Sequence, residues 1–251
     1  MDIDHDLSLD EIMKFLEEER KKIDTFKGLL SGRIKENGTS SSFYAALYLY
    51  SGKNQDLLED GLFIDNYIRD IWRLKVFNRI GFRLLDIIFR SNRFKLYIPS
   101  KDKWIEGDIL NNNLFIEESN TTLPIINIMN IIGLPPPGII SIDKIYIPVL
   151  EAREDYYILS LFIRDKEEET AMLRKRLWIK RDNLVLDKEE IFDRYGRVSI
   201  LIYFEDYDIV SDIYIPYKIR VIWERENRTI SLRFTEIYLN ILLKKGDFEI
   251  R

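Results

Sequence analysis

The chain has 251 residues, with 38 Lys and Arg against 43 Asp and Glu, so its formal net charge is −5, and 46% of its residues are hydrophobic. It contains no Cys and only one His, which excludes disulfides and cysteine nucleophiles and leaves little from which to build a Ser-His-Asp relay or a multi-histidine metal site. The excess of Ile (39) over Ala (4), with 14 Tyr and 14 Phe, favours a mostly β protein.

The N-terminus is acidic and lacks the basic and apolar regions of a signal peptide. The longest apolar run covers residues 43–50, far fewer than the roughly 20 residues that a membrane-spanning helix needs. Two alternatives therefore stay open for location. The protein is cytoplasmic, or the chain is the mature part of an exported protein whose signal has been removed.

Residues 8–26 are predicted to form an amphipathic helix. Ser8 followed by Glu11 is a capping box. Apolar residues then recur at helical spacing, and charged residues 17–22 occupy the other face. The apolar positions are Leu9, Ile12, Met13, Leu16 and Ile23. We interpret this segment as a helix that packs against the rest of the protein.

From Lys27 onward the hydrophobic period changes to two, which predicts strands. The first group covers residues 27–36, 42–50, 61–66, 67–78, 81–90, 93–99 and 104–107. The second group covers residues 156–164, 172–180, 185–195, 197–207, 215–223 and 229–238. Turn signals separate them, including Ser91-Asn92, residues 181–183, Gly196 and Glu226-Asn227. The short connections indicate an antiparallel meander, because parallel strands need long crossovers.

A different segment lies between the two strand groups. Residues from about 124 to 133 have helical spacing, with Pro124 at the first helical position and Gly133 before three prolines. Its apolar residues include Ile125, Ile128, Met129 and Ile132. Because it is apolar around most of its circumference, it must be covered on several sides. It is either a buried core helix or a lid over a hydrophobic cavity.

Charge is concentrated in one region, residues 69–103, which holds 10 basic and 3 acidic residues. On alternating strands, the side chains of Arg73, Lys75, Arg93 and Lys95 would project from one sheet face. This face is either a solvated outer surface or one that attracts an anionic headgroup or an acidic protein partner. We expect no nucleic-acid partner, because the isoelectric point of the whole chain is about 5.3.

Catalytic motifs are missing from the sequence. It has no phosphate loop, GxGxxG, GxSxG or HExxH. The acidic groups Asp206 with Asp208, and Asp187 with Glu189 and Glu190, lie in or beside predicted turns, where carboxylates are common. We therefore predict a protein that is not an enzyme, with no catalytic residue, no cofactor and no metal.

The order of elements resembles that of the outer-membrane lipoprotein carrier and receptor (LolA/LolB-like) superfamily. The resemblance rests on the leading helix and strand, the segment from Arg93 to Gly107, and the run from Leu177 to Val221 with its Tyr195-Gly196-Arg197 hairpin and Ile215-Pro216 strand entry. It implies one domain over residues 1–251: an unclosed antiparallel half-barrel, mostly β (α+β), with an N-terminal helix and a central lid or plug helix. It also implies a periplasmic protein or an outer-membrane-anchored lipoprotein.

The resemblance implies non-enzymatic binding of lipid or lipoprotein acyl chains in an apolar cavity, in envelope transport or assembly. Apolar faces of the predicted strands and helix supply the expected cavity residues. These are Phe94, Leu96, Ile125, Ile128, Met129, Ile132, Tyr217, Ile219, Trp223, Leu232 and Phe234. We expect a monomer whose membrane contact is peripheral or made through a removed N-terminal anchor. The alternative is an envelope interaction or scaffold protein that uses the same fold without an internal ligand.

Overall fold

The computed structural model describes residues 6–51, 71–90, 93–108, 145–164 and 170–248. These residues form one α-helix and thirteen strands. The helix is α1 (Leu9–Lys21), and the first strands are β1 (Thr25–Glu36), β2 (Thr39–Tyr50), β3 (Ile71–Phe77), β4 (Arg83–Arg90), β5 (Arg93–Ile98) and β6 (Lys103–Asp108). The remaining strands are β7 (Ile147–Ala152), β8 (Tyr156–Arg164), β9 (Ala171–Lys180), β10 (Leu186–Phe192), β11 (Val198–Val210), β12 (Ile213–Trp223) and β13 (Arg228–Leu239).

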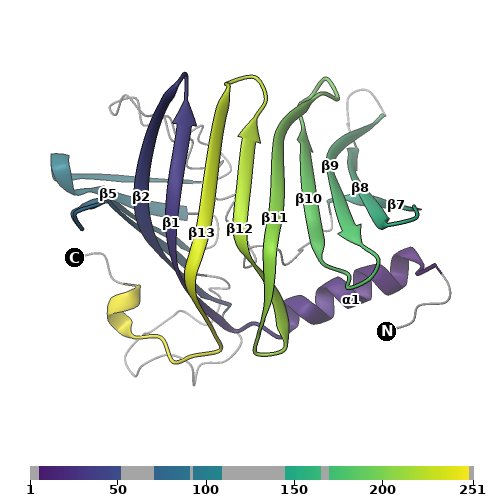
Figure 1. Cartoon of the computed structure of the whole chain (residues 1–251), viewed down its shortest axis with the longest axis horizontal. Helices are drawn as coiled ribbons and strands as arrows, with labels where there is room; N and C mark the ends of the chain where they lie inside the picture. The colour runs from purple at the N-terminus through teal and green to yellow at the C-terminus, as the bar shows by residue number, and fades with distance from the viewer. Residues whose placement is uncertain (1–5, 52–70, 91–92, 109–144, 165–169, 249–251) are drawn as a thin grey trace. The chain divides into compact units, whose positions relative to one another are not determined.

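The strands form a mostly antiparallel sheet in the order β6-β5-β4-β3-β2-β1-β13-β12-β11-β10-β9-β8-β7 (Figure 1). Every pair of neighbours in this order is consecutive in the chain except β1 and β13. The consecutive strands β6 and β7 are instead the two ends of the order and leave the sheet unclosed. The predicted fold class, an unclosed antiparallel sheet with an N-terminal helix, is therefore confirmed. The predicted central helix at 124–133, the strand at 61–66 and the Ser91-Asn92 turn lie outside the described residues.

The chain divides into two compact units. Unit 1 comprises Met1–Lys21, Ile34–Ser40 and Pro137–Ser231, and unit 2 comprises Lys22–Arg33, Ser41–Pro136 and Leu232–Arg251. Unit 1 buries Ile12 and Leu16 of α1, and unit 2 buries both faces of its central strands. The expectation of a single domain stays a prediction.

The predicted capping box is present at the start of α1. Glu11 N donates to Ser8 Oγ at 3.3 Å, and Ser8 N donates to Glu11 Oε2 at 2.8 Å. The prediction was wrong about the other end, because the helix ends at Lys21 and not at Phe26. The chain beyond it bonds to Asn240 instead: Asp24 N donates to Asn240 Oδ1 at 2.8 Å, and the Asn240 side-chain amide donates to the Lys22 carbonyl at 2.8 Å.

Two further predictions about strands were wrong: one strand ends earlier than predicted, and one strand was not predicted. The strand predicted at 185–195 ends at Phe192, because Asp193 Oδ1 accepts hydrogen bonds from the backbone N–H groups of Tyr195 (2.8 Å) and Arg197 (3.0 Å) and closes a turn. Gly196 takes a φ of 72° in this turn, which glycine adopts without strain. Strand β7 was not predicted, because Pro148 interrupts its pattern; proline is tolerated there because β7 lies at the sheet edge.

Gly32 on β1 permits a close contact with an aromatic ring. A Cβ built on Gly32 would lie 2.1 Å from Cζ of Phe43 on β2. We expect Gly32→Ala to lower the free energy of unfolding by about 1–3 kcal/mol through overpacking. Urea denaturation measures this. Gly246→Ala is the control, because its Cβ would meet no atom within 4 Å. An unchanged Gly32→Ala midpoint would show that the Phe43 ring simply moves aside.

Candidate ligand-binding face

Unit 2 presents one continuous apolar face on strands β2 to β5. The register places Trp72 of β3 between Leu49 and Phe89, and it pairs Phe89 with Phe94 of β5. Because side chains alternate along a strand, every second residue joins this face. Its members, which we call the apolar face, are Ala45, Leu47, Leu49, Trp72, Leu74, Val76, Leu85, Ile87, Phe89, Phe94 and Leu96.

All members of the apolar face are buried, and none carries a charge. Leu96 is 0% exposed and Ile87 is 2% exposed. The charged residues of the same strands, including Arg73 and Asp86, have the opposite strand parity and belong to the other face. Such an uninterrupted hydrocarbon surface suits alkyl chains and offers few polar groups to a hydrophilic ligand.

Strands β1 and β13 continue apolar packing in unit 2. The rings of Phe26 and Phe234 meet edge to face with centroids 5.9 Å apart. Gly28 lies against them, and a Cβ there would be 2.7 Å from Cε1 of Phe234. Leu232 is buried on the same side of β13 as Phe234. The absent side chain at Gly28 makes room for the Phe234 ring.

The eleven residues predicted to line a cavity fall into three sets. Phe94, Leu96, Leu232 and Phe234 are buried in unit 2. The second set, Tyr217, Ile219 and Trp223, shares one face of β12 in unit 1; Ile219 and Trp223 are buried, whereas Tyr217 is half-buried. The third set, Ile125, Ile128, Met129 and Ile132, lies outside the described residues. Their assembly into one cavity stays a prediction.

The corresponding face of unit 1 is not purely apolar. The register aligns Glu189 with Leu177 and Ile202, and Lys175 with Leu161 and Ile191. Lys175 Nζ lies 2.9 Å from Glu189 Oε1, and the Glu189 side chain is 10% exposed. This ion pair interrupts the hydrocarbon surface. Unit 2 is therefore the better candidate for an alkyl-binding site.

The basic region at 69–103 differs from its prediction. Arg73 was expected to project toward solvent, but it is 1% exposed. Its Nε and Nη2 donate to the two carboxylate oxygens of Asp86 at 2.8 and 2.6 Å, and its Nη1 donates to the Gly246 carbonyl at 2.8 Å. Lys75 is half-buried; burial, followed by repulsion from Arg73, lowers its pKa. Arg93 and Lys95 are exposed.

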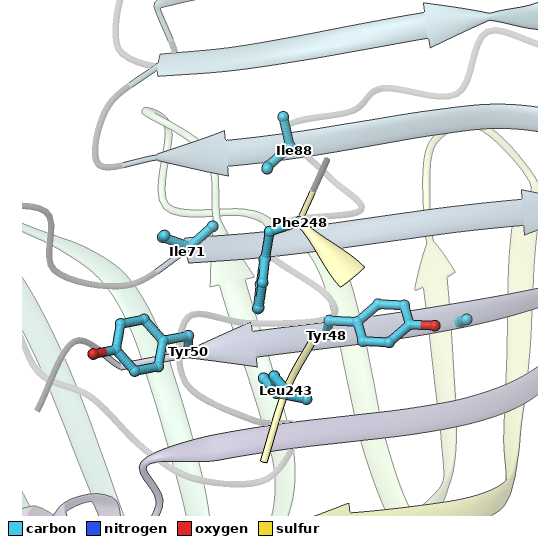
Figure 2. Close-up of a cluster of buried hydrophobic side chains, with 7 residues drawn as sticks. Tyr48, Tyr50, Ile71, Ile88, Leu243 and Phe248 are labelled. Atoms are coloured by element: carbon cyan, nitrogen blue, oxygen red, sulfur yellow. The ribbon is translucent and has the colours of Figure 1, made fainter. Parts of the chain in front are cut away.

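Arg73 is buried because the C-terminal strap, residues 240–248, covers this face of unit 2. Leu243 and Phe248 of the strap are fully buried in a cluster with residues of β2, β3 and β4 (Figure 2). The other members of the cluster are Ala46, Tyr48, Tyr50, Ile71 and Ile88. Burial, and next the charge of Asp247, raise the pKa of the Tyr48 hydroxyl. The strap therefore gives unit 2 a second buried layer, on the side opposite the apolar face.

Of the two acidic groups considered as catalytic candidates, the group of Asp187, Glu189 and Glu190 forms ion pairs, whereas Asp208 Oδ1 accepts from the backbone N–H of Ile209 at 2.8 Å. Lys180 Nζ lies 3.0 Å from Asp187 Oδ1, Glu190 accepts from Lys188 (2.9 Å) and Arg176 (3.3 Å), and Glu189 pairs with Lys175 as described. Within the described ranges, no group of three or more His, Cys, Asp and Glu residues is arranged to hold a metal ion. Asp187, Glu189 and Glu190 therefore form structural ion pairs on the strands of unit 1.

Sequence reasoning missed two features. The indole nitrogen of Trp72 has no hydrogen-bond partner among the residues that the structure describes. The turn between β3 and β4 holds Ile80 (79% exposed) and Phe82 (68% exposed) in solvent. The hydrophobic pattern indicated that Trp72 lies in a strand and that Ile80 and Phe82 lie in or beside strands. It gave no information on the exposure of these side chains or on their hydrogen bonds, because both depend on neighbours that are distant in sequence. Gly81, which follows Asn78 by three residues, was the available signal for the turn.

Helices long and apolar enough to cross a bilayer do not occur in the part of the chain that the structure describes.

No family model matches the sequence, and no curated protein is significantly similar to it. Solved structures do match. A putative outer membrane lipoprotein-sorting protein domain from Vibrio parahaemolyticus has a TM-score of 0.66 at 12% identity, with 95% of each chain covered.

Two other solved structures support the same fold. A DUF1329 family protein from Desulfovibrio piger has a TM-score of 0.63 at 13% identity, covering 95% of this chain and 94% of that one. A LolA superfamily protein from Nitrosomonas europaea has a TM-score of 0.58 at 16% identity, covering 98% and 99%. At these identities the similarity concerns the fold alone. The chain has a LolA/LolB-like fold.

Proposed function

We propose that the protein is a non-enzymatic binder of lipid or lipoprotein acyl chains in the bacterial cell envelope, acting in transport or assembly. The observation that carries this proposal is the apolar face of unit 2, a buried surface without charge on four adjacent strands. The fold shared with lipoprotein-sorting and LolA superfamily proteins supports the envelope setting. A periplasmic or outer-membrane-anchored location follows from the same proposal.

The energetics suit reversible binding. Each buried methylene contributes about 0.8 kcal/mol, so a chain of about twelve carbons gains roughly 10 kcal/mol before costs. Association costs about 4–15 kcal/mol in lost freedom, and only the difference appears as affinity. A hydrocarbon surface can therefore hold an acyl chain and release it without any chemical reaction.

Native purification followed by mass spectrometry of an organic extract tests the proposal. We expect stoichiometric copurified lipid and saturable binding of a fluorescent fatty acid. Ile87→Phe, which enlarges a side chain at the centre of the apolar face, should weaken that binding about tenfold, whereas Ile147→Phe on exposed β7 should not. A lipid-free extract together with no saturable binding by the unaltered protein would favour the interaction or scaffold alternative.

The turn between β3 and β4 supports a peripheral membrane contact. Asn78 Oδ1 accepts from the backbone N–H groups of Ile80 (3.1 Å) and Phe82 (2.9 Å), which fixes the turn while both side chains project into solvent. Arg79, also exposed, adds positive charge. Exposed apolar side chains beside a cation are suited to an anionic bilayer surface, where the ring enters the interface and the cation meets phosphates.

Sedimentation with vesicles measures this contact. We expect the protein to bind vesicles of mixed phosphatidylglycerol and phosphatidylcholine more tightly than pure phosphatidylcholine, and less tightly at high salt. Ile80→Ser combined with Phe82→Ser should weaken the binding about tenfold. Leu242→Ser removes an apolar side chain that is 58% exposed elsewhere and is the control. Equal binding by the double variant and the control would contradict a role for this turn.

A further inference from the structure

Two arginines on the strap side of unit 2 lie directly opposite each other. Arg90 ends β4 and Arg93 begins β5, and the register makes them cross-strand partners. Arg90 is also aligned with Ile71, which belongs to the cluster beneath the strap, but both arginines are exposed. Like charges directly opposite each other on two strands are destabilising. The arrangement is therefore unfavourable unless an anion lies between the two guanidinium groups.

Neither guanidinium of this pair has a hydrogen-bond or ion-pair partner among the residues that the structure describes. Neighbouring cations on the same strands do have one. Arg83 Nη1 donates to Asp86 Oδ2 at 3.1 Å, and Lys95 Nζ lies 3.0 Å from a carboxylate oxygen across the β5–β6 pair. Guanidinium groups bind carboxylates through two parallel hydrogen bonds. The arginine pair therefore offers two such forks to carboxylates from outside the described residues.

An aromatic stack continues the same side of the sheet onto its last strand, β6. The rings of Tyr97 on β5 and Trp104 on β6 stack with centroids 4.6 Å apart, and Lys95 Nζ lies 4.6 Å from the centroid of the Trp104 ring. The register puts Tyr97 and Lys95 on the same side of β5 as Arg93. Trp104 is nevertheless 41% exposed. We call Arg90, Arg93, Lys95, Tyr97 and Trp104 the basic–aromatic patch.

The composition of the basic–aromatic patch fits a protein partner better than a membrane. Trp, Tyr and Arg are enriched among the residues that carry most of the affinity in protein interfaces. The stack and the cation hold the Trp104 ring in place, so that binding orders few additional rotamers. The patch also lies at the other end of β4 from the exposed turn, and a strand of 8 residues spans roughly 24 Å. A bilayer that takes up Ile80 and Phe82 at the turn therefore lies away from the arginine pair.

We propose that the basic–aromatic patch docks an acidic segment of a partner protein, with adjacent carboxylates between Arg90 and Arg93 and an apolar side chain against Trp104. The interaction goes beyond acyl-chain binding and uses no residue of the apolar face. Because the whole chain carries a net charge of −5, an acidic segment is attracted to this patch and repelled by the chain as a whole. Arg93 and Tyr97 are separated on β5 by roughly 13 Å. An extended segment along β5 would therefore carry its carboxylates about four residues from its apolar side chain.

Fluorescence anisotropy with two labelled peptides tests the proposal. One peptide carries two adjacent Glu residues with a Phe four positions away on either side, and the other has Gln in place of both Glu. The unaltered protein should bind the Glu peptide about tenfold more tightly at low salt, and the difference should shrink at high salt. Arg90→Gln combined with Arg93→Gln should bring the ratio of the two affinities to about one. Arg194→Gln combined with Arg197→Gln, which removes the same charge from two exposed arginines beside the exposed Tyr195, should keep the ratio.

Trp104→Ala separates the aromatic contact from the charge. It should weaken the binding of both peptides by about fivefold and leave their ratio unchanged, because the lost contact is with Phe, which both peptides carry. Tyr195→Ala, which removes an aromatic ring that is 64% exposed elsewhere, should weaken neither peptide.

Three results would overturn the proposal. The first is that the unaltered protein shows no preference for the Glu peptide, and the second is that the two double-arginine variants lose the preference equally. The third is that the Arg90 and Arg93 double variant keeps its peptide binding but loses binding to phosphatidylglycerol vesicles, because the patch would then contact headgroups. Copurified lipid reports on the apolar face alone, so failure of the proposed function and failure of this docking site are distinguishable.

Discussion

Asp86→Ala is expected to lower the free energy of unfolding by about 3–5 kcal/mol, the usual cost of leaving a buried charge without its partner. The Asp86 side chain is 0% exposed and that of Arg73 is 2% exposed, so solvent cannot replace the lost carboxylate. Asp86 also accepts from Arg83 Nη1 at 3.1 Å, so two guanidinium groups lose an acceptor. Urea denaturation, with a fixed protein concentration and circular dichroism as the signal, measures the change.

Glu106→Ala is the matched control for Asp86→Ala. It also removes a carboxylate that pairs across two strands, Lys95 Nζ to Glu106 Oε1 at 3.0 Å, but both side chains are about half exposed. Exposed pairs contribute less than about 1 kcal/mol. Similar losses for the two variants would contradict the burial of the Arg73–Asp86 pair beneath the strap.

Phe248→Ala is expected to destabilise the protein by about 3–5 kcal/mol, as for other fully buried phenylalanines. Phe248 is 1% exposed and lies over Ile71 and Tyr48, from strands more than 170 positions earlier in the chain (Figure 2). Its loss leaves a cavity and loosens the strap whose Gly246 carbonyl accepts from Arg73. Thermal unfolding and hydrogen exchange of residues 71–77 measure the two effects.

Leu242→Ala controls for a general effect of changing the strap. Leu242 belongs to the same segment but is 58% exposed, so little packing is lost. We expect a change within about 0.5 kcal/mol, which is usual for surface substitutions. If Phe248→Ala behaved like Leu242→Ala, the strap would contribute little to the stability of unit 2.

The sequence predicted correctly those features that depend only on residues close together in the chain. The reciprocal bonds of Ser8 and Glu11 depend on residues three apart, and the alternation of Phe94 with Lys95 depends on strand geometry alone. Both were predictable from sequence. The end of α1 was not, because the bonds that stop it come from Asn240, more than 200 residues away.

For the candidate site as well, the sequence predicted features set by nearby residues but not those set by contacts between distant segments. Alternation indicated that Phe94 and Leu96 share a buried face and that Arg73 lies on the other one. It could not show that residues 240–248 cover Arg73, nor that the turn at Ile80 stays uncovered. It also gave no sign that the Trp72 donor lacks a partner, because a hydrogen bond depends on atoms brought near by folding.

The sequence by itself determined the antiparallel meander, the capped start of the N-terminal helix and the apolar parity of the strands that it predicted, because these follow from residue spacing and backbone geometry. Only the tertiary structure decided which faces are covered, which charges are paired and which buried donors, such as Trp72 Nε1, are left without a partner among the described residues. Burial and pairing are properties of contacts between distant segments, and a period in the sequence carries no information about the partner that a face will meet.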